Sequence, residues 1–226
     1  MADSEPVARN DPQTISIKSV YLCAGLFAVA AMAALLVDLA VANFFLEIKP
    51  QLPGDVDKLI NLFEAMGLGL GVAAIFLVIL VLDPRARLQM PRLVVCLYFP
   101  GLVVIGLKHL IGRARPSTYF DELTATCNSV WDTFVSGSGH AFQSFPSGHT
   151  TIAVSAAVTL AWLYPRGRWL FACYAAFAAT QRMYVGAHYL SDVFAAAAIA
   201  SLLSGLCLDR RVLGGVFERI ERRRGK

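Results

Sequence analysis

Charged residues are scarce in this sequence of 226 residues: Asp, Glu, Lys and Arg make up 16% of the chain, whereas hydrophobic residues make up 57%. Soluble domains carry about a quarter charged residues and under half apolar ones. The mean hydropathy is accordingly high, at +0.58. A chain with so few polar side chains cannot cover a globule with them. The composition therefore argues against a soluble enzyme and against a disordered or collagen-like chain, and it predicts an integral membrane protein.

Cysteine is not enriched either. Four of the five cysteines lie inside apolar runs and only Cys127 falls in a polar stretch, so no disulfide framework is predicted. The sequence also has no cluster of carboxylates or thiolates that suggests a metal site. We therefore expect neither a metal nor another cofactor.

Long apolar runs are the main feature of the chain. A helix needs roughly 20 apolar residues to cross a bilayer, and lipid forces the backbone to form its hydrogen bonds within the helix. We predict an all-α membrane protein with six transmembrane helices and a helical-bundle catalytic core. The fourth helix is short unless it begins near Ser147, and the first is too long for a cleaved signal peptide, so we expect a retained anchor. The expected spans are 20–46, 60–82, 93–111, 150–164, 169–187 and 190–208.

Basic residues are unevenly distributed along the chain. If the N-terminus is cytoplasmic, fourteen of the twenty Lys and Arg residues fall on the cytoplasmic side, the bias that membrane proteins show. We predict a cytoplasmic tail at 1–19, a membrane domain at 20–208 and a basic cytoplasmic tail at 209–226. Anionic headgroups explain this basic tail better than nucleic acid does. We expect membrane lipids as partners and no nucleic acid, and a bacterial plasma membrane fits the compact chain.

A long polar loop, 117–147, is expected on the extracytoplasmic side, with a short helix around 129–135. Loops of this length are usually functional or disordered. Its aromatic residues have two interpretations: an apolar lid over a lipid tail, or an interfacial aromatic belt. These residues are Trp131, Phe134, Phe142 and Phe145.

Ionisable residues gather at the outer ends of spans three to six, where their cost in lipid indicates a functional site. They form three short patterns. The first is Lys108, six intervening residues and Arg115-Pro116, the second is Pro146-Ser147-Gly148-His149, and the third is Arg182, five residues, His188, three residues and Asp192. The Lys and Arg of the first pattern share a helix face. The second pattern opens a helix, whose N-terminus binds anions. His188 and Asp192 are four apart, so the carboxylate is expected to accept a bond from the imidazole and leave its other nitrogen as a nucleophile or base.

In these three patterns the sequence resembles the type 2 phosphatidic acid phosphatase superfamily, over about 108–192. Gln181 stands where the family usually has Ser, so we expect altered support of the site rather than its loss. The resemblance implies a metal-independent phosphatase in which His188 attacks phosphorus to give a phosphohistidine and Asp192 orients it. His149 would protonate the leaving oxygen and later activate water. The phosphate oxygens would be bound by Lys108, Arg115, Ser147, Gly148 and Arg182.

Five further polar residues lie outside the three patterns. Arg113 lies off the Lys–Arg face and its role is open, with contact to headgroups alone as one interpretation. Asp38 and Glu64 are expected at span ends facing water, although Glu64 has a second interpretation, lining the substrate entry. His109 is expected at the interface and His140 in a solvated loop, both outside the site.

The predicted function is hydrolysis of a lipid phosphate monoester or pyrophosphate at the extracytoplasmic face. The candidate substrates are undecaprenyl pyrophosphate, phosphatidylglycerophosphate, phosphatidic acid and the lipid A phosphates. Two alternatives remain open, a lipid phosphotransferase on the same scaffold and a catalytically inactive membrane scaffold or transporter. No obligate protein partner is implied.

Overall fold

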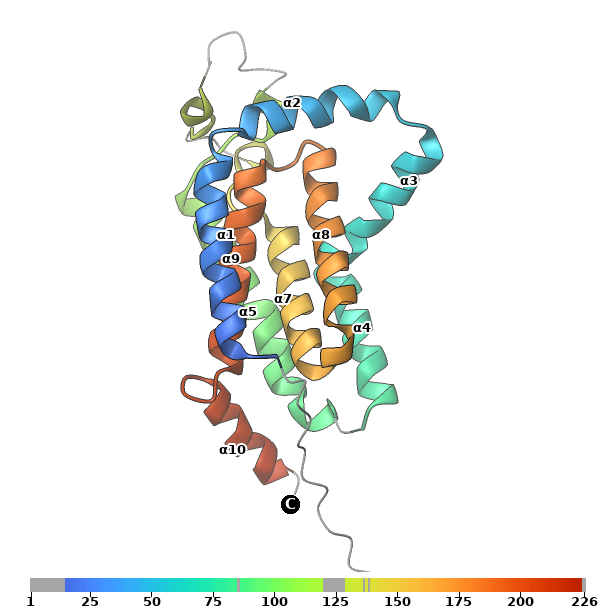
Figure 1. Cartoon of the computed structure of the whole chain (residues 1–226), viewed down its shortest axis with the longest axis vertical. Coiled ribbons are helices and arrows are strands. Elements are labelled where there is room, and N and C mark those ends of the chain that lie inside the picture. Colours follow the sequence, from blue (N-terminus) through green and yellow to red (C-terminus); the bar gives the residue numbers. More distant parts are fainter. Residues whose placement is uncertain (1–14, 85, 120–128, 136, 138, 225–226) are drawn as a thin grey trace, which may run out of the picture.

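The structure, a computed structural model, describes residues 15–84, 86–119, 129–135, 137 and 139–224. Cys127 and most of the N-terminal tail lie outside this part. Six of the described helices run along the long axis of the molecule (Figure 1): α1 (Ile17–Ala34), α4 (Gly69–Leu82), α5 (Met90–Leu110), α7 (Gly148–Leu163), α8 (Arg168–Tyr184) and α9 (Leu190–Leu208). Helix α7 packs against α5, α8 and α9, and α1 packs against α9. The bundle therefore has α7 and α9 at its centre.

Small residues allow α9 to approach its neighbours closely, as expected for a membrane helix. Ala196 and Ala200 are fully buried, and the hydroxyl of Ser204 donates to the carbonyl of Cys96 on α5 at 3.0 Å. At Gly205 a Cβ would lie only 2.9 Å from the ring of Tyr21 on α1. The Ala-rich run thus serves packing.

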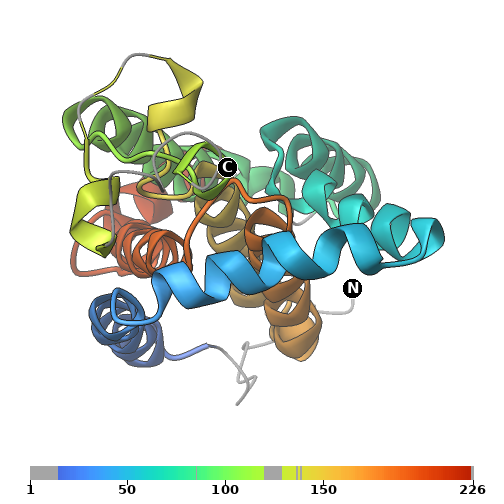
Figure 2. The ribbon, with the colours of Figure 1, turned by 90° about the horizontal axis from the view of Figure 1, so that it is seen from above.

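The predicted first span, 20–46, is wrong in its extent. Helix α1 ends at Ala34, and after a turn the chain continues as α2 (Asp38–Ile48). Helix α2 lies across one end of the bundle instead of along it (Figure 2). The reason is Asp38 in the apolar run. Its carboxylate forms a buried ion pair with Arg113, which holds this part of the chain at the end of the bundle.

The predicted second span, 60–82, is broken. Helix α3 (Gly54–Leu62) continues into a 3₁₀ segment, η2 (Phe63–Gly67), before α4 begins, and α3 and α4 are bent by 65°. A Cβ at Gly67 would lie 2.8 Å from Cβ of His149, so only glycine lets η2 come this close to α7. The break places η2 against α7 and α8.

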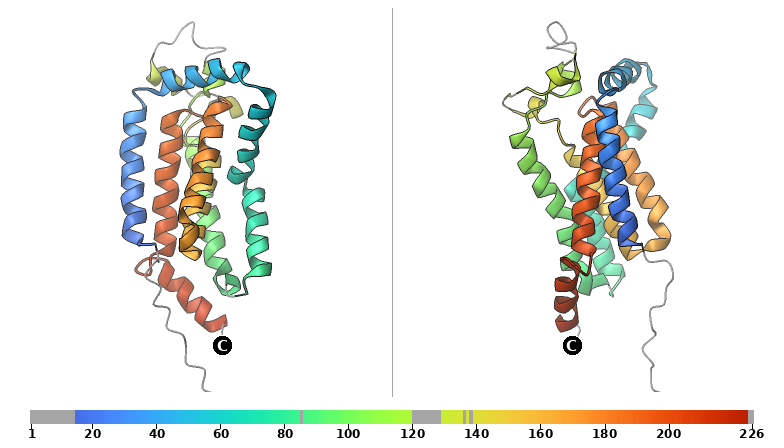
Figure 3. Two further views of the ribbon diagram at one scale, coloured as in Figure 1. Left: turned by 45° about the vertical axis from the view of Figure 1, so that its right-hand side comes forward. Right: turned by 60° about the vertical axis from the view of Figure 1, so that its left-hand side comes forward.

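Within the described residues, three helical segments are long and apolar enough to cross a membrane alone, and the bent α3–α4 pair would be a fourth. The three are α1, Ala86–Leu110 (the 3₁₀ helix η3, Ala86–Gln89, and α5) and α9. Helix α7 has 16 residues and starts at Gly148, as expected, and α8 has 17. Apolar side chains such as Leu22, Leu70 and Leu102 face outward. The start of α1 and the C-terminal helix α10 (Gly214–Arg224) lie at the end opposite α2 (Figures 1 and 3).

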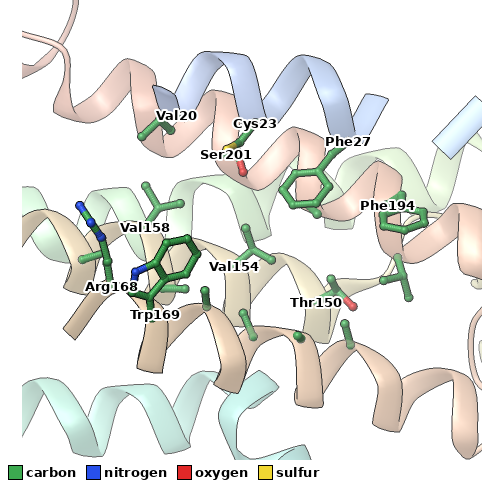
Figure 4. A pocket seen from close by; sticks show the side chains of 18 of the residues that line it. Val20, Cys23, Phe27, Thr150, Val154, Val158, Arg168, Trp169, Phe194 and Ser201 are labelled. Atoms are coloured by element: carbon green, nitrogen blue, oxygen red, sulfur yellow. The ribbon is translucent and has the colours of Figure 1, made fainter. Parts of the chain in front are cut away.

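An apolar groove of about 450 Å³ runs along the bundle between α1, α7, α8 and α9 (Figure 4). It extends from Arg168 and Trp169, at the end nearer α10, to Thr150 and Phe194 near the α2 end. Its lining is almost entirely apolar, so in a bilayer the groove presents an apolar surface next to the polar residues at the α2 end of the bundle.

Candidate active site

The residues of the three sequence patterns meet at the end of the bundle that α2 crosses. Lys108 is in the last turn of α5, and Arg115 precedes the short helix α6 (Pro116–Thr118). The Ser-Gly-His segment starts α7, Arg182 is in the last turn of α8, and His188 lies between α8 and α9. The charges of Arg115, Lys108 and Arg182 all lower the pKa of the same loop histidine, His140. The structure therefore gathers the predicted site residues at one place.

The imidazole of His188 is buried and has a defined tautomer. Its Nδ1 lies 2.7 Å from the carbonyl oxygen of Ser144. Because a carbonyl only accepts hydrogen bonds, the ring proton belongs on Nδ1 and Nε2 keeps its lone pair. Burial lowers the pKa of His188 to about 4; the Asp192 carboxylate acts in the opposite direction, and the cations Lys108 and Arg115 add a smaller lowering effect. The ring is therefore neutral near pH 7, as a nucleophile must be.

The expected direct bond between His188 and Asp192 is not formed. The nearest carboxylate oxygen, Oδ2, is 3.8 Å from Nδ1. Ser144 connects the two instead: its carbonyl accepts from His188, and its hydroxyl donates to Oδ2 of Asp192 at 2.6 Å. The backbone N–H of Tyr189 donates to the same oxygen at 2.8 Å. Asp192 thus reaches the imidazole mainly through Ser144, which the sequence analysis missed.

The headgroup interpretation of Arg113 and the expectation for Asp38 are wrong, because both side chains are fully buried. Arg113 donates to Asp38 at 2.8 Å through Nη2 and to Asp192 through Nη1. The backbone N–H of Ser191 donates to the second oxygen of Asp38 at 2.9 Å. A buried charge needs partners of this kind. The buried ion network therefore joins α2, the chain after α5 and the start of α9 behind the proposed nucleophile.

Aromatic rings pack against the guanidinium of Arg113. It lies 4.1 Å from the ring centroid of Tyr189 and 4.5 Å from that of Phe134, an arrangement that favours a cation. Phe134 follows a short 3₁₀ helix, η5 (Val130–Thr133), close to where the sequence predicts one. Phe134 therefore supports the buried ion network, whereas Trp131 is 65% exposed.

Loop atoms hold the Lys and Arg of the first pattern. Nζ of Lys108 donates to the carbonyl of Gln143 at 2.5 Å. Nε of Arg115 donates to the carbonyl of His140 at 2.9 Å, and Nη2 lies 2.9 Å from Nε2 of the same residue. The charge of Arg115 lowers the pKa of His140, so that its neutral ring accepts. His140 therefore borders the site, contrary to expectation.

The start of α7 forms an anion-binding corner. The hydroxyl of Ser147 caps the helix by accepting from the backbone N–H of Thr150 at 3.4 Å. At Gly148 a Cβ would lie 3.7 Å from Cε of Lys108, so the lysine side chain passes the helix N-terminus. Backbone N–H groups in a first helical turn lack intrahelical partners, and the helix dipole is positive there. The corner suits a phosphate.

Glu64 lies at the edge of this site, on η2. Its Oε1 accepts from Nη1 of Arg182 at 2.8 Å and lies 3.7 Å from Nε2 of His149. Its side chain is 42% exposed. Among the described residues, Nε2 of His149 and Nε of Arg182 are buried atoms without a hydrogen-bond partner. Both nitrogens are available to an anion.

Gln181 supports the site indirectly. Its side chain is 1% exposed, and its amide donates to Oδ1 of Asn61 on α3 at 3.2 Å. One turn later, the hydroxyl of Tyr184 donates to Asp57 at 2.8 Å. These contacts fasten α3, which continues into η2, to α8 on either side of Arg182. In the described ranges, no group of three or more His, Cys, Asp or Glu residues is placed to hold a metal.

The chain is similar to lipid phosphatases of bacteria. It is 40% identical over 116 residues to proteins named lipid A 1-phosphatase from Rhizobium johnstonii and Rhizobium etli. The match covers 50% of this chain, and the chain spans about half the length of these relatives, 45% and 47%.

Two crystal structures share the fold. LpxE from Aquifex aeolicus matches with a TM-score of 0.57 and 22% identity, over 74% of this chain and 93% of its own. The transmembrane PAP2-type phosphatidylglycerolphosphate phosphatase from Bacillus subtilis also has a TM-score of 0.57, with 19% identity over 90% of this chain and 96% of its own. The family model of the PAP2 superfamily matches residues 90–211, which include all the proposed site residues. This integral membrane protein belongs to the PAP2 superfamily.

Proposed function

We propose that the protein is a lipid phosphatase that works through a phosphohistidine on His188. The observation that carries the proposal is the hydrogen bond from Nδ1 of His188 to the carbonyl of Ser144, which leaves Nε2 unprotonated. A neutral imidazole fixed in this way, among Lys108, Arg115 and Arg182, is suited to attack phosphorus. Positioning and charge neutralisation of this kind supply most of the catalysis in phosphoryl transfer.

The reaction has two balanced steps. In the first, Nε2 of His188 bonds to phosphorus, the bond from phosphorus to the lipid oxygen breaks, and His149 gives that oxygen a proton. In the second, a water oxygen bonds to phosphorus, the N–P bond breaks, and His149 takes the proton of the water. The phosphate oxygens would be bound by Lys108, Arg115, Arg182 and the Ser147–Gly148 segment.

The proposed substrate is a bacterial membrane lipid that carries a phosphate. The relatives named lipid A 1-phosphatase make the lipid A 1-phosphate the first to test; phosphatidylglycerophosphate, phosphatidic acid and undecaprenyl pyrophosphate follow. We place six helices in the bacterial inner membrane, both termini in the cytoplasm and the site on the opposite face. The start of α1 and helix α10 lie at the same end of the bundle (Figure 1), which supports this topology. A reporter fused after Lys226 should behave as cytoplasmic.

Phosphate release by the purified protein in detergent, with EDTA present, tests the activity. The wild type should release stoichiometric inorganic phosphate, and His188→Ala should release none. Arg87→Met is the matched control, because its partners are backbone carbonyls at the other end of the bundle. Loss of the lipid phosphate without free phosphate would support a phosphotransferase. Release that persists in His188→Ala would refute the phosphohistidine.

A further inference from the structure

Glu64 has no part in the mechanism above, yet its carboxylate touches two of the residues in it. It accepts from Arg182 at 2.8 Å and lies 3.7 Å from Nε2 of His149. Nothing in the three sequence patterns requires an acidic residue beside a phosphate site. The break between α3 and α4, with the close approach of Gly67 to His149, is what brings η2 and its carboxylate here.

The position of Glu64 relative to the reacting bond follows from the exposure of the two histidines. In-line displacement places the leaving oxygen opposite the nucleophile. The His188 side chain is 3% exposed, so the leaving group must point toward the open side of the site. The side chains of His149, at 30%, and Glu64, at 42%, are more exposed than those of His188 and Arg182, the latter at 10%. Because His149 is the proposed proton donor to the leaving oxygen and its Nε2 lies 3.7 Å from Glu64, that oxygen departs close to the Glu64 carboxylate.

We propose that Glu64 makes the site selective for lipid phosphomonoesters over lipid diphosphates, an inference that rests on the function proposed above. A monoester leaves as a neutral alcohol once His149 has protonated it. A diphosphate leaves as a lipid phosphate, whose negative charge would pass next to the Glu64 carboxylate. Like charges brought together in this way discriminate against the wrong substrate.

The test compares substrates that differ only in the number of phosphates. Farnesyl phosphate and farnesyl diphosphate form one pair, and lipid A 1-phosphate and lipid A 1-diphosphate form the second. The initial rate of cleavage of each lipid is followed by chromatography, and the ratio of kcat/KM for monoester and diphosphate is measured. In Glu64→Gln the carbonyl oxygen still accepts from Arg182, so the variant removes the charge and keeps the contact. Asp55→Asn, a 96% exposed acid on α3, removes the same charge away from the site.

The wild type and Asp55→Asn should favour the monoester. Glu64→Gln should lower this preference by about tenfold, which corresponds to roughly 1.4 kcal/mol, mainly through faster cleavage of the diphosphate. An equal change for both lipids would mean that Glu64 only competes for Arg182, and it would overturn the inference while leaving the phosphatase intact. Absence of cleavage of all four lipids by folded wild type would instead overturn the proposed function.

Discussion

Arg113→Met tests whether the buried ion network holds the site together. Arg113 donates to four side chains, of which Asp38 and Asp192 are fully buried carboxylates. Removing the guanidinium leaves both carboxylates without their cation. Breaking a buried pair costs about 3–5 kcal/mol, which for a chain of this size lowers Tm by about 6–20 °C. The assay is thermal unfolding in detergent, beside phosphate release, which should also be lost.

Two comparisons isolate the charge effect. Arg210→Met removes an exposed Arg that pairs with Glu218; a surface pair is worth about 1 kcal/mol or less, so Tm should fall by about 4 °C at most. Asp38→Asn should destabilise the wild type, because it loses a charge-assisted bond, but stabilise Arg113→Met, because it removes an unpaired buried charge. The same effect of Asp38→Asn in both backgrounds would refute the reasoning.

Three further predictions concern the nucleophile and its surroundings. The folded protein keeps His188 neutral down to a pKa of about 4, whereas the unfolded chain protonates it near 6.5. As the pH falls through this window, the wild type should therefore lose up to about 3 kcal/mol of stability relative to His188→Gln. If the difference in unfolding free energy between the two proteins does not change with pH, the burial of His188 is contradicted. Ser144→Ala should cost about 1–3 kcal/mol in unfolding free energy and reduce kcat, since Asp192 loses a short hydrogen bond. A kcat equal to that of the wild type would contradict the role of Ser144 in connecting Asp192 to His188. Gly67→Ala should lower kcat through displacement of His149, with phosphate release as the readout and Gly106→Ala, where a Cβ meets nothing within 4 Å, as the control.

The spacing of the three patterns was enough to predict that their own side chains gather at one end of the bundle. Helix periodicity places Lys108 at the end of one span, and the Gly-His pair at the start of the next, so their proximity follows from the topology of an antiparallel bundle. The sixth span, with the bounds 190–208, was also predictable, because small and apolar residues continue without interruption after Asp192 in its first turn. These features depend on local sequence alone.

The ion pair of Arg113 with Asp38 was not predictable in the same way. The two residues are 75 positions apart, and hydropathy treats 20–46 as one continuous run. The available signal was Asp38 itself, a charge inside an apolar segment, where a partner or a break is expected. The bond from His188 to Ser144 was hidden for a different reason: its acceptor is a backbone carbonyl, which every residue has, so that no residue type marks it.

The buried and the open parts of the site carry opposite charges, and the proposed chemistry needs both. In the proposed reaction, Lys108, Arg115 and Arg182 would face the substrate and neutralise the phosphate. Behind the nucleophile, one Arg lies among two Asp residues, a formal charge of −1. In the proposed first step His188 goes from a neutral ring to a positively charged phosphoimidazole, while its Nδ1 keeps its proton and still donates it to the Ser144 carbonyl. A negative layer behind the ring stabilises the ring more when it is charged than when it is neutral. Burial keeps the nucleophile neutral before the reaction, and the network of Arg113, Asp38 and Asp192 favours the charge that forms during it.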